Sequence, residues 1–300
     1  MRIVTNPGSN LPRQALAHYA IEESPQQIVV GATAHDTRAP ISYATIDRWI
    51  RTSPEFPHVV GTTAHEFVAV FSTLAREDPE LIVVLTSKQI IQTHAAAVSA
   101  ARTLKTALAF KNTEIVVIDS RMTDAATGLL VLAAGEARRA GLGLRKTQRV
   151  LELLAERATL AFVPSTLDNL VKGGRAGWAR AQIAGLLQLL PIVGFREGEL
   201  ASIDRIRRSS DHAEALLDHA LKAHGRGRPV WAVALHSDPS DERAMNLLAR
   251  VRSVFDVRYG FVRPLSPGSY IHAGAGALGL VVVPVDGLPW ELPAPPTFAS

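Results

Sequence analysis

Cysteine is absent from the 300 residues of the sequence. Its absence excludes disulfide bonds, thiolate-bound metals and a cysteine nucleophile. The 10 histidines are scattered, and none has the H-x-x-x-H spacing of a metal site. The sequence also lacks the Walker A motif of a phosphate-binding loop and the G-x-S-x-G motif of a serine hydrolase. We therefore expect no metal centre, no cofactor and no self-sufficient catalytic apparatus.

Excess charge and long apolar runs are also missing. The net charge is only +4, and no basic run is interleaved with aromatic residues, which make up 6% of the chain. Such a composition argues against a nucleic-acid partner. No apolar run reaches the ~18 residues that a membrane-spanning helix needs, and the first residues lack the pattern of a signal peptide. We expect a soluble, cytoplasmic protein without stable membrane insertion.

Apolar residues, 47% of the chain, are enough for a substantial core, and in the first half they gather in short runs. The runs RIVT, QIVVG, LIVVLTS and EIVVIDS have the length of strands, and helical patterns over about 92–109 and 124–140 follow the last two. Continuous apolar strands are typical of a sheet that is covered on both faces. Strands that alternate with helices indicate parallel pairing. The sequence therefore predicts a parallel-sheet α/β domain over residues 1–157.

The second half mixes hairpins with helices. PIVGFREGELASIDRIR predicts a hairpin that turns at Glu197 and Gly198. We expect an α+β domain over residues 158–285 and a Pro-rich tail over 286–300, whose composition is typical of partial disorder. The other predicted elements are strands at ATLAFVPS, PVWAVALHS, FDVRYGFVR and LGLVVVP, and helices at TLDNLVKGG, at WARAQIAGLLQLL up to Pro191, at 209–223 and at 239–253.

A glycine-rich segment near the end imitates a dinucleotide-binding motif. GAGALG, from Gly274 to Gly279, matches G-x-G-x-x-G, but a strand-like run follows where that motif needs a helix. We therefore do not expect NAD. The stretch from His272 to Gly276 instead predicts a loop whose backbone closely approaches a ligand. An ordinary glycine-rich turn between strands is the alternative.

Several turns are placed where an anion could bind. TSKQII links a strand to a helix, and the unpaired N–H groups at a helix start attract anions. In VKGGRAGW, Arg175 follows two glycines, and its guanidinium could bind a carboxylate or a phosphate. A glycine cap with two solvated cations is the alternative there. In VIDSRMTD, Asp124 is placed to cap the helix that follows.

Taken in order, these segments resemble the motifs of one family, the DegV-type fatty-acid-binding proteins, over about residues 1–285. The family turn Asp-Ser-x-x-Asp-Leu-Pro is similar to NPGSNLP, and Thr-Ser-Gln-Pro-Ser-x-x-Glu-Phe is similar to VVGTTAHEF. Ser-Ser-x-Leu-Ser-Gly-Thr-Tyr-Gln-Ser-Ala is similar to TSKQIIQTHAA, and VIDS is unchanged. The most specific matches are Gly-Gly-Arg in LDNLVKGGR and the late His-x-Gly-x-Gly-Ala in HAGAGA.

The resemblance implies a two-domain fold with a long-chain fatty acid between the domains. FakB-type members of the family carry the acyl chain for bacterial fatty acid kinase, whose separate subunit binds ATP and phosphorylates the carboxylate. Such members bind and present the lipid and are not themselves enzymes. By this resemblance, Arg175 and His272 lie near the acyl head and face the kinase subunit.

The residues that hold the carboxylate in the family are replaced in this chain. The family Thr falls on Val59, the family Ser falls on Ile90, and the Gly after that Ser falls on Ile91. A buried carboxylate without partners is costly, so other groups must donate to it. The candidates are Thr62, Thr63, Ser87 and Gln92, with charge from Arg175 or His272 and backbone contacts from Gly274 and Gly276.

Two other functions remain open. The chain could be a divergent paralogue whose pocket has changed or is vestigial and which acts as an interaction protein. It could also be an enzyme on a small substrate, with Arg175 and His272 as charge stabiliser and acid or base, although no nucleophile or paired carboxylates accompany them. An apolar interdomain tunnel would favour lipid binding, a filled pocket the interaction protein, and an open polar cleft the enzyme.

Overall fold

The computed structural model describes residues 1–175 and 189–298, whose strands form three sheets. The sheet built from the N-terminal part has the strand order β2-β1-β6-β7, and all its neighbouring strands run parallel. The runs RIVT, LIVVLTS and EIVVIDS therefore form the predicted parallel sheet. Its strands are β1 (Arg2–Thr5), β2 (Ile21–Glu23), β6 (Glu80–Leu85) and β7 (Glu114–Asp119).

The C-terminal part forms a mixed sheet of six strands in the order β10-β9-β8-β13-β11-β12. The neighbours β11 and β12 run parallel, and the other neighbouring pairs are antiparallel. Its strands are β8 (Thr159–Val163), β9 (Leu189–Arg196), β10 (Glu199–Arg207), β11 (Pro229–His236), β12 (Asp256–Pro264) and β13 (Leu278–Pro284).

A third sheet corrects one prediction. QIVVG does not join the parallel sheet: its strand β3 (Gln27–Val30) pairs antiparallel with β4 (Thr33–Asp36) and β5 (His58–Val60). The reason lies in the connection after β3. The chain reverses at Gly31, whose φ is +57°, and enters β4 at once. Such a tight turn can join only antiparallel strands, because a parallel pair needs a longer crossover.

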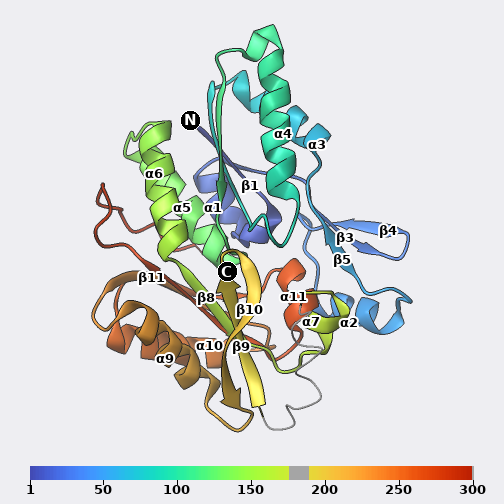
Figure 1. Cartoon of the computed structure of the whole chain (residues 1–300), viewed down its shortest axis with the longest axis vertical. Coiled ribbons are helices and arrows are strands. Elements are labelled where there is room, and N and C mark those ends of the chain that lie inside the picture. Colours follow the sequence, from blue (N-terminus) through green and yellow to red (C-terminus); the bar gives the residue numbers. More distant parts are fainter. Residues whose placement is uncertain (176–188, 299–300) are drawn as a thin grey trace.

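Helices cover both faces of the two larger sheets (Figure 1). The helices α3 (Ala64–Ala75) and α4 (Thr93–Thr106) pack on one face of the parallel sheet. The helices α5 (Ala125–Arg139) and α6 (Leu144–Arg157) lie between the parallel sheet and the mixed sheet. The helices α9 (His212–His224) and α10 (Glu242–Val254) pack on the outer face of the mixed sheet.

The strand β11 illustrates why a continuous apolar run suits this arrangement. Successive side chains of a strand point to opposite faces. Trp231, Val233 and Leu235 accordingly face the core that contains α5, whereas Val230 and Ala234 face the core that contains α9 and α10. The fold class, a parallel-sheet N-terminal part with a mixed-sheet C-terminal part, is confirmed. The domain boundary at residue 157 stays a prediction.

The predicted hairpin is present, and the helix predicted before it is partly corrected. Glu197 and Gly198 have φ values of 52° and +89°, which suit the tight turn between β9 and β10. The predicted helix WARAQIAGLLQLL lies mostly outside the described residues. Its end does not lie in a helix, because β9 begins at Leu189 and contains Pro191. Proline is tolerated there because it lies near the start of the strand.

The C-terminal tail departs from the expected partial disorder over 286–298. Arg228 forms an ion pair with Asp286 at 2.8 Å, and Arg157 donates to the backbone oxygen of Asp286 at 2.8 Å. Farther along, the ring of Phe298 lies 5.9 Å from the ring of Tyr19. These contacts hold the described part of the tail against the protein.

The described residues also contain four short helices and two 3₁₀ turns. The helix α11 corrects the prediction of a loop from His272 to Gly276, because His272 lies in its last turn and the loop begins at Gly274. Ser266 starts this helix by accepting a hydrogen bond from the backbone N of Ser269. The elements are α1 (Arg13–His18), α2 (Tyr43–Thr52), α7 (Asp168–Lys172), α11 (Pro267–Ala273) and the turns Pro7–Ser9 and Leu108–Phe110.

Candidate functional site

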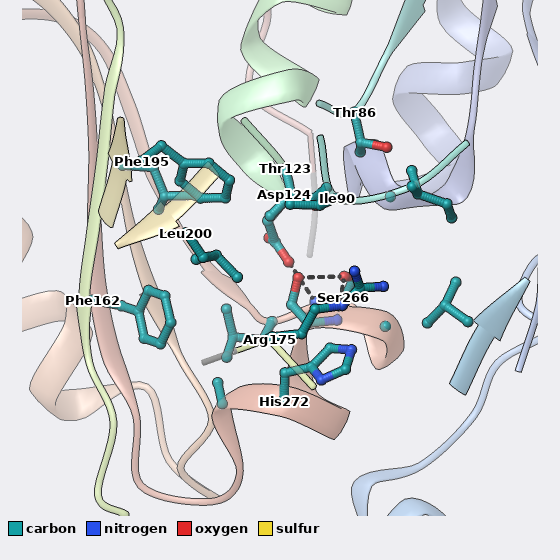
Figure 2. A pocket seen from close by; sticks show the side chains of 18 of the residues that line it. Thr86, Ile90, Thr123, Asp124, Phe162, Arg175, Phe195, Leu200, Ser266 and His272 are labelled. Carbon is teal, nitrogen blue, oxygen red and sulfur yellow. Dashed lines mark hydrogen bonds between the residues drawn. The ribbon is translucent and has the colours of Figure 1, made fainter. Parts of the chain in front are cut away.

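A cavity lies between the carboxyl ends of the parallel strands, the mixed sheet and α11 (Figure 2). Ligands of open α/β sheets commonly bind outside the carboxyl ends of the strands. The space open to the centres of water-sized molecules is ≈ 100 Å³. A single buried water needs about 10–15 Å³ on this measure, so the cavity has room for a molecule larger than water.

The wall formed by the mixed sheet is apolar. Phe162 on β8, Phe195 on β9 and Leu200 on β10 lie together on one side of the cavity (Figure 2). Leu160 and Leu235, on β8 and β11, extend this wall. Because these side chains offer no hydrogen-bonding groups, they favour an apolar part of a ligand.

The opposite wall comes from the turns that follow β6 and β7. Ile90 and Ile91 follow β6, and both line the cavity. Ser87, in the same turn, donates a hydrogen bond of 2.7 Å to the backbone oxygen of Gly198. That bond joins the turn after β6 to the hairpin that carries Phe195. The cavity is therefore enclosed by segments of both larger sheets.

The end of α7 explains why two glycines precede Arg175. Gly174 has a φ of +68°, its backbone N donates to the oxygen of Val171 at 3.1 Å, and the backbone N of Arg175 donates to the oxygen of Leu170 at 2.9 Å. This pair of bonds is a Schellman motif, which needs a left-handed residue such as glycine. The two glycines thus form the helix cap that the sequence suggested, but of the two cations only Lys172 is exposed, whereas Arg175 lines the cavity.

Arg175 brings positive charge to the cavity without a protein partner among the described residues. Its side chain is half-buried, and burial lowers the pKa of its guanidinium. Within residues 1–175 and 189–298, no Asp or Glu forms an ion pair with it. A desolvated cation gains most from an anion that it can bind through two hydrogen bonds. Arg175 is thus a candidate partner for an anionic ligand group.

His272 lies against Gly173 at the same end of the cavity. A Cβ atom at residue 173 would lie 2.3 Å from Nδ1 of His272, so the glycine leaves room for the ring. Burial, together with the charge of Arg175, lowers the pKa of the His272 imidazole to about 3. At neutral pH the ring is uncharged, and it offers the ligand a hydrogen bond without adding charge.

We expect Gly173→Ala to destabilise the protein by about 1–3 kcal/mol, the usual cost of forcing an extra methyl group into a packed site. The variant His272→Ala removes the ring that the new methyl group would strike. The double variant should therefore lose less stability than the sum of the two single variants. Urea denaturation at neutral pH gives the free energy of unfolding of wild type, the two single variants and the double variant. Lys172→Ala, at an exposed residue, is the control. Additive losses would mean that the two residues do not interact in this way.

Asp124 lines the cavity but is already bound to protein. Its Oδ1 accepts from Asn10 Nδ2 at 2.6 Å and from the backbone N of Ala125 at 2.9 Å, as predicted for a cap of α5. Its Oδ2 accepts from the backbone N of Ser266 at 3.0 Å (Figure 2). These bonds satisfy the carboxylate and join the start of α5 to the start of α11. Asp124 therefore shapes the cavity by holding two helices in place.

Five of the sequence-predicted site residues line the cavity. They are Val59, Ile90, Ile91, Arg175 and His272. The first lies on β5, the next two in the turn after β6, and the others at the ends of α7 and α11. The tertiary structure thus brings together residues that are more than 200 positions apart in the sequence.

The four predicted donors with polar side chains lie outside the lining, and three of them hold structural hydrogen bonds. Thr62 shares a hydrogen bond of 2.8 Å with Ser24, and Thr63 caps α3 together with Glu66. Ser87 binds the β9–β10 hairpin as described, and the Gln92 side chain is exposed at the start of α4. These bonds leave the hydroxyl groups poorly placed to hold a ligand.

The glycines of the late loop also serve the fold. The backbone oxygen of Gly274 accepts from Ser237 Oγ at 2.6 Å, and that of Gly276 accepts from Arg243 at 3.3 Å. Both glycines have positive φ, at +71° and +79°. They are needed for the turn from α11 into β13, and neither lines the cavity.

Several polar residues of the lining were not expected from the sequence. Their positions in turns or at a helix start are also typical of ordinary caps and turn formers. Asp124 was identified as a cap but not as part of the cavity. The unexpected residues with polar side chains are Gln26, Thr86, Thr123, Ser266 and Ser269.

The described residues also bear on metal binding and on membrane insertion. Within residues 1–175 and 189–298, no three His, Asp or Glu side chains are grouped as a metal site would need. None of the helices in these ranges combines the length and the apolar character needed to cross a membrane.

Comparison with known proteins agrees with this geometry. A DegV domain-containing protein of Streptomyces coelicolor is 29% identical over 293 residues, covering 93% of this chain and 97% of that protein. A fatty-acid-binding DegV family protein from Thermus thermophilus has the same fold, with a TM-score of 0.84, 24% identity, and coverage of 95% of this chain and 100% of that chain.

A stearic-acid-binding protein from Eubacterium ventriosum also shares the fold, with a TM-score of 0.82, 19% identity, and coverage of 95% of this chain and 98% of that chain. At these identities the two solved structures establish the fold alone. The family model described as uncharacterised proteins of the DegV family matches residues 1–285. With nearly the whole chain matched and the fold in agreement, this protein belongs to the DegV family.

Proposed function

We propose that this protein binds one long-chain fatty acid in the cavity and presents its carboxylate to a separate, ATP-binding kinase subunit. The observation that carries the proposal is the half-buried guanidinium of Arg175, which pairs with no carboxylate of the described residues and lies at one end of a mainly apolar cavity. A fatty acid matches both parts, because its chain prefers the apolar wall and its carboxylate can pair with the cation. The relatives from Thermus thermophilus and Eubacterium ventriosum bind such ligands.

In this proposal the chain binds and positions, and the partner supplies ATP. The fatty-acid carboxylate oxygen attacks the γ-phosphorus of ATP, the bond from that phosphorus to ADP breaks, and acyl phosphate and ADP leave. Arg175 holds the carboxylate at the mouth of the cavity. His272, neutral because its pKa is about 3, adds no second positive charge that would lower the nucleophilicity of the carboxylate. Holding the reacting group in position is a major part of catalysis by such a complex.

Native mass spectrometry of protein purified from cells tests the binding proposal. We expect a species heavier than the chain by the mass of one long-chain fatty acid, and that mass should disappear after denaturing extraction. Leu200→Trp should lower the occupied fraction at least tenfold, because the larger ring fills space next to Phe162 and Phe195. Leu108→Trp is the matched control, since Leu108 is 86% exposed and does not line the cavity.

A wild-type protein that carries no lipid and does not bind oleate in a fluorescence titration would contradict the binding proposal. The kinase part is tested separately by adding candidate ATP-binding subunits with ATP and trapping acyl phosphate with hydroxylamine. Lipid binding without acyl phosphate formation by any such subunit would limit the function to lipid binding.

A further inference from the structure

A buried pair of amide side chains lies beside the cavity. Asn6, which follows β1, is 1% exposed, and Gln26, which precedes β3, is 5% exposed. The backbone N of Thr86 donates to Oδ1 of Asn6 at 3.2 Å. Because a backbone N–H can only donate, the oxygen of the Asn6 amide must face Thr86. The amide nitrogen of Asn6 therefore faces the other way, towards Gln26.

The orientation of Asn6 determines the orientation of Gln26. The Nδ2 of Asn6 donates to Oε1 of Gln26 at 2.9 Å and to Oγ1 of Thr86 at 3.3 Å. The oxygen of the Gln26 amide is thus occupied, and its Nε2 points away from Asn6. None of the described residues accepts a hydrogen bond from this nitrogen, and Gln26 lines the cavity. An amide N–H at the edge of a cavity that no described protein group engages is free to donate to a ligand oxygen there.

The free amide nitrogen lies next to one of the positions at which a hydroxyl was expected. A Cβ atom at Gly268 would lie 3.4 Å from Cγ2 of Val59 and 4.0 Å from Nε2 of Gln26. Both side chains therefore border the same point on α11. Val59 cannot donate a hydrogen bond, whereas the Gln26 amide beside it has two N–H groups to offer.

We propose that Gln26 binds the ligand head group and supplies the hydrogen bond that Val59 and Ile90 cannot. The inference rests on the proposed function, because it assumes a carboxylate in this cavity. Gln26 contributes a neutral donor that the Asn6–Thr86 network holds in one orientation, and Arg175 contributes the charge. The site then selects a head group that accepts hydrogen bonds, such as a carboxylate, over one that only donates, such as an ammonium.

Two substitutions test this inference by fluorescence titration with oleate and with oleylamine, which carry the same chain but opposite head groups. Gln26→Met removes the donor, and it should weaken oleate binding by about tenfold to a hundredfold and leave oleylamine within about threefold. Gln26→Glu keeps the oxygen that accepts from Asn6 but places a carboxylate oxygen where Nε2 was. It should weaken oleate more strongly than Gln26→Met and tighten oleylamine. Gln27→Met, at the exposed neighbouring residue, is the control.

The outcomes separate this inference from the proposed function. Equal oleate affinities for wild type, Gln26→Met and Gln26→Glu would overturn the role of Gln26 while the binding proposal stands. Equal losses for oleate and oleylamine in both variants would assign Gln26 a purely structural role, which also overturns it. A wild-type protein that does not bind oleate would overturn the proposed function, and the inference would fall with it. Thermal melting of each variant shows whether it is folded. If Gln26→Met does not fold, Gln26→Glu still tests the inference, because it retains the bond from Asn6.

Discussion

Replacing Arg175 with Met is expected to weaken the binding of an anionic fatty acid by about tenfold to a hundredfold, the value of a hydrogen-bonded charge pair. The guanidinium is half-buried, and no described carboxylate forms an ion pair with it. Methionine keeps much of the length of the side chain and its apolar packing, so the loss reports the charge and the hydrogen bonds. The effect should shrink for the methyl ester of the same fatty acid, which has no charge to pair.

The matched control for this prediction is Lys172→Met, which removes a positive charge three residues before Arg175, at the end of α7. The Lys172 side chain is exposed and does not line the cavity. If positive charge acted only through long-range attraction to the carboxylate, both variants would lose similar affinity for the fatty acid. Titrations with oleate and methyl oleate at moderate and high salt compare the proteins. Equal affinities of Arg175→Met and wild type for oleate would place the carboxylate elsewhere. Loss of acyl phosphate formation with unchanged binding would restrict Arg175 to the interface with the kinase subunit.

Acidification should destabilise the wild-type protein through His272. Burial and the nearby charge of Arg175 lower the pKa of this imidazole from 6.5 to about 3. Between these values the unfolded chain binds a proton at His272 and the folded protein does not. The unfolded state is therefore favoured as the pH falls below about 6.5, and the contribution levels off near the folded pKa. At pH 4.5 the loss from this residue should be about 2–3 kcal/mol relative to pH 7.5.

The comparison of wild type with His272→Gln isolates this effect from the other titrating groups, which both proteins share. Urea denaturation at pH 7.5 and at pH 4.5 gives the free energy of unfolding of each. The difference between wild type and variant should change by about 2–3 kcal/mol in favour of the variant at the lower pH. The same substitution at exposed His65 is the control for replacing a histidine by glutamine. A difference that does not change with pH would mean that His272 is solvated and titrates freely.

Much of the fold follows from local patterns in the sequence. The centres of β1, β6 and β7 are continuous apolar runs, IV, LIVVL and IVVI, and a strand covered on both faces requires such a run. The turn at Glu197 and Gly198 and the cap at Asp124 are also local, because they depend on backbone conformations that neighbouring residues allow. The partners of β3 could not be identified in this way, because a short apolar run does not reveal whether its neighbour will be parallel or antiparallel.

In the candidate site, too, some residues could be recognised from local sequence and others only from tertiary contacts. The sequence by itself was enough to name Val59, Ile90, Arg175 and His272 as candidates, because each lies in a segment that resembles a family motif, and all four line the cavity. It could not show that Thr62 and Ser87 are already bound to protein, nor that Gln26 borders the cavity. The hydrogen bonds of Gln26 run through Asn6 to Thr86, over separations of 20 and 80 residues. Whether a polar side chain is free to hold a ligand depends on which distant groups pair with it, and only the tertiary structure decides that pairing.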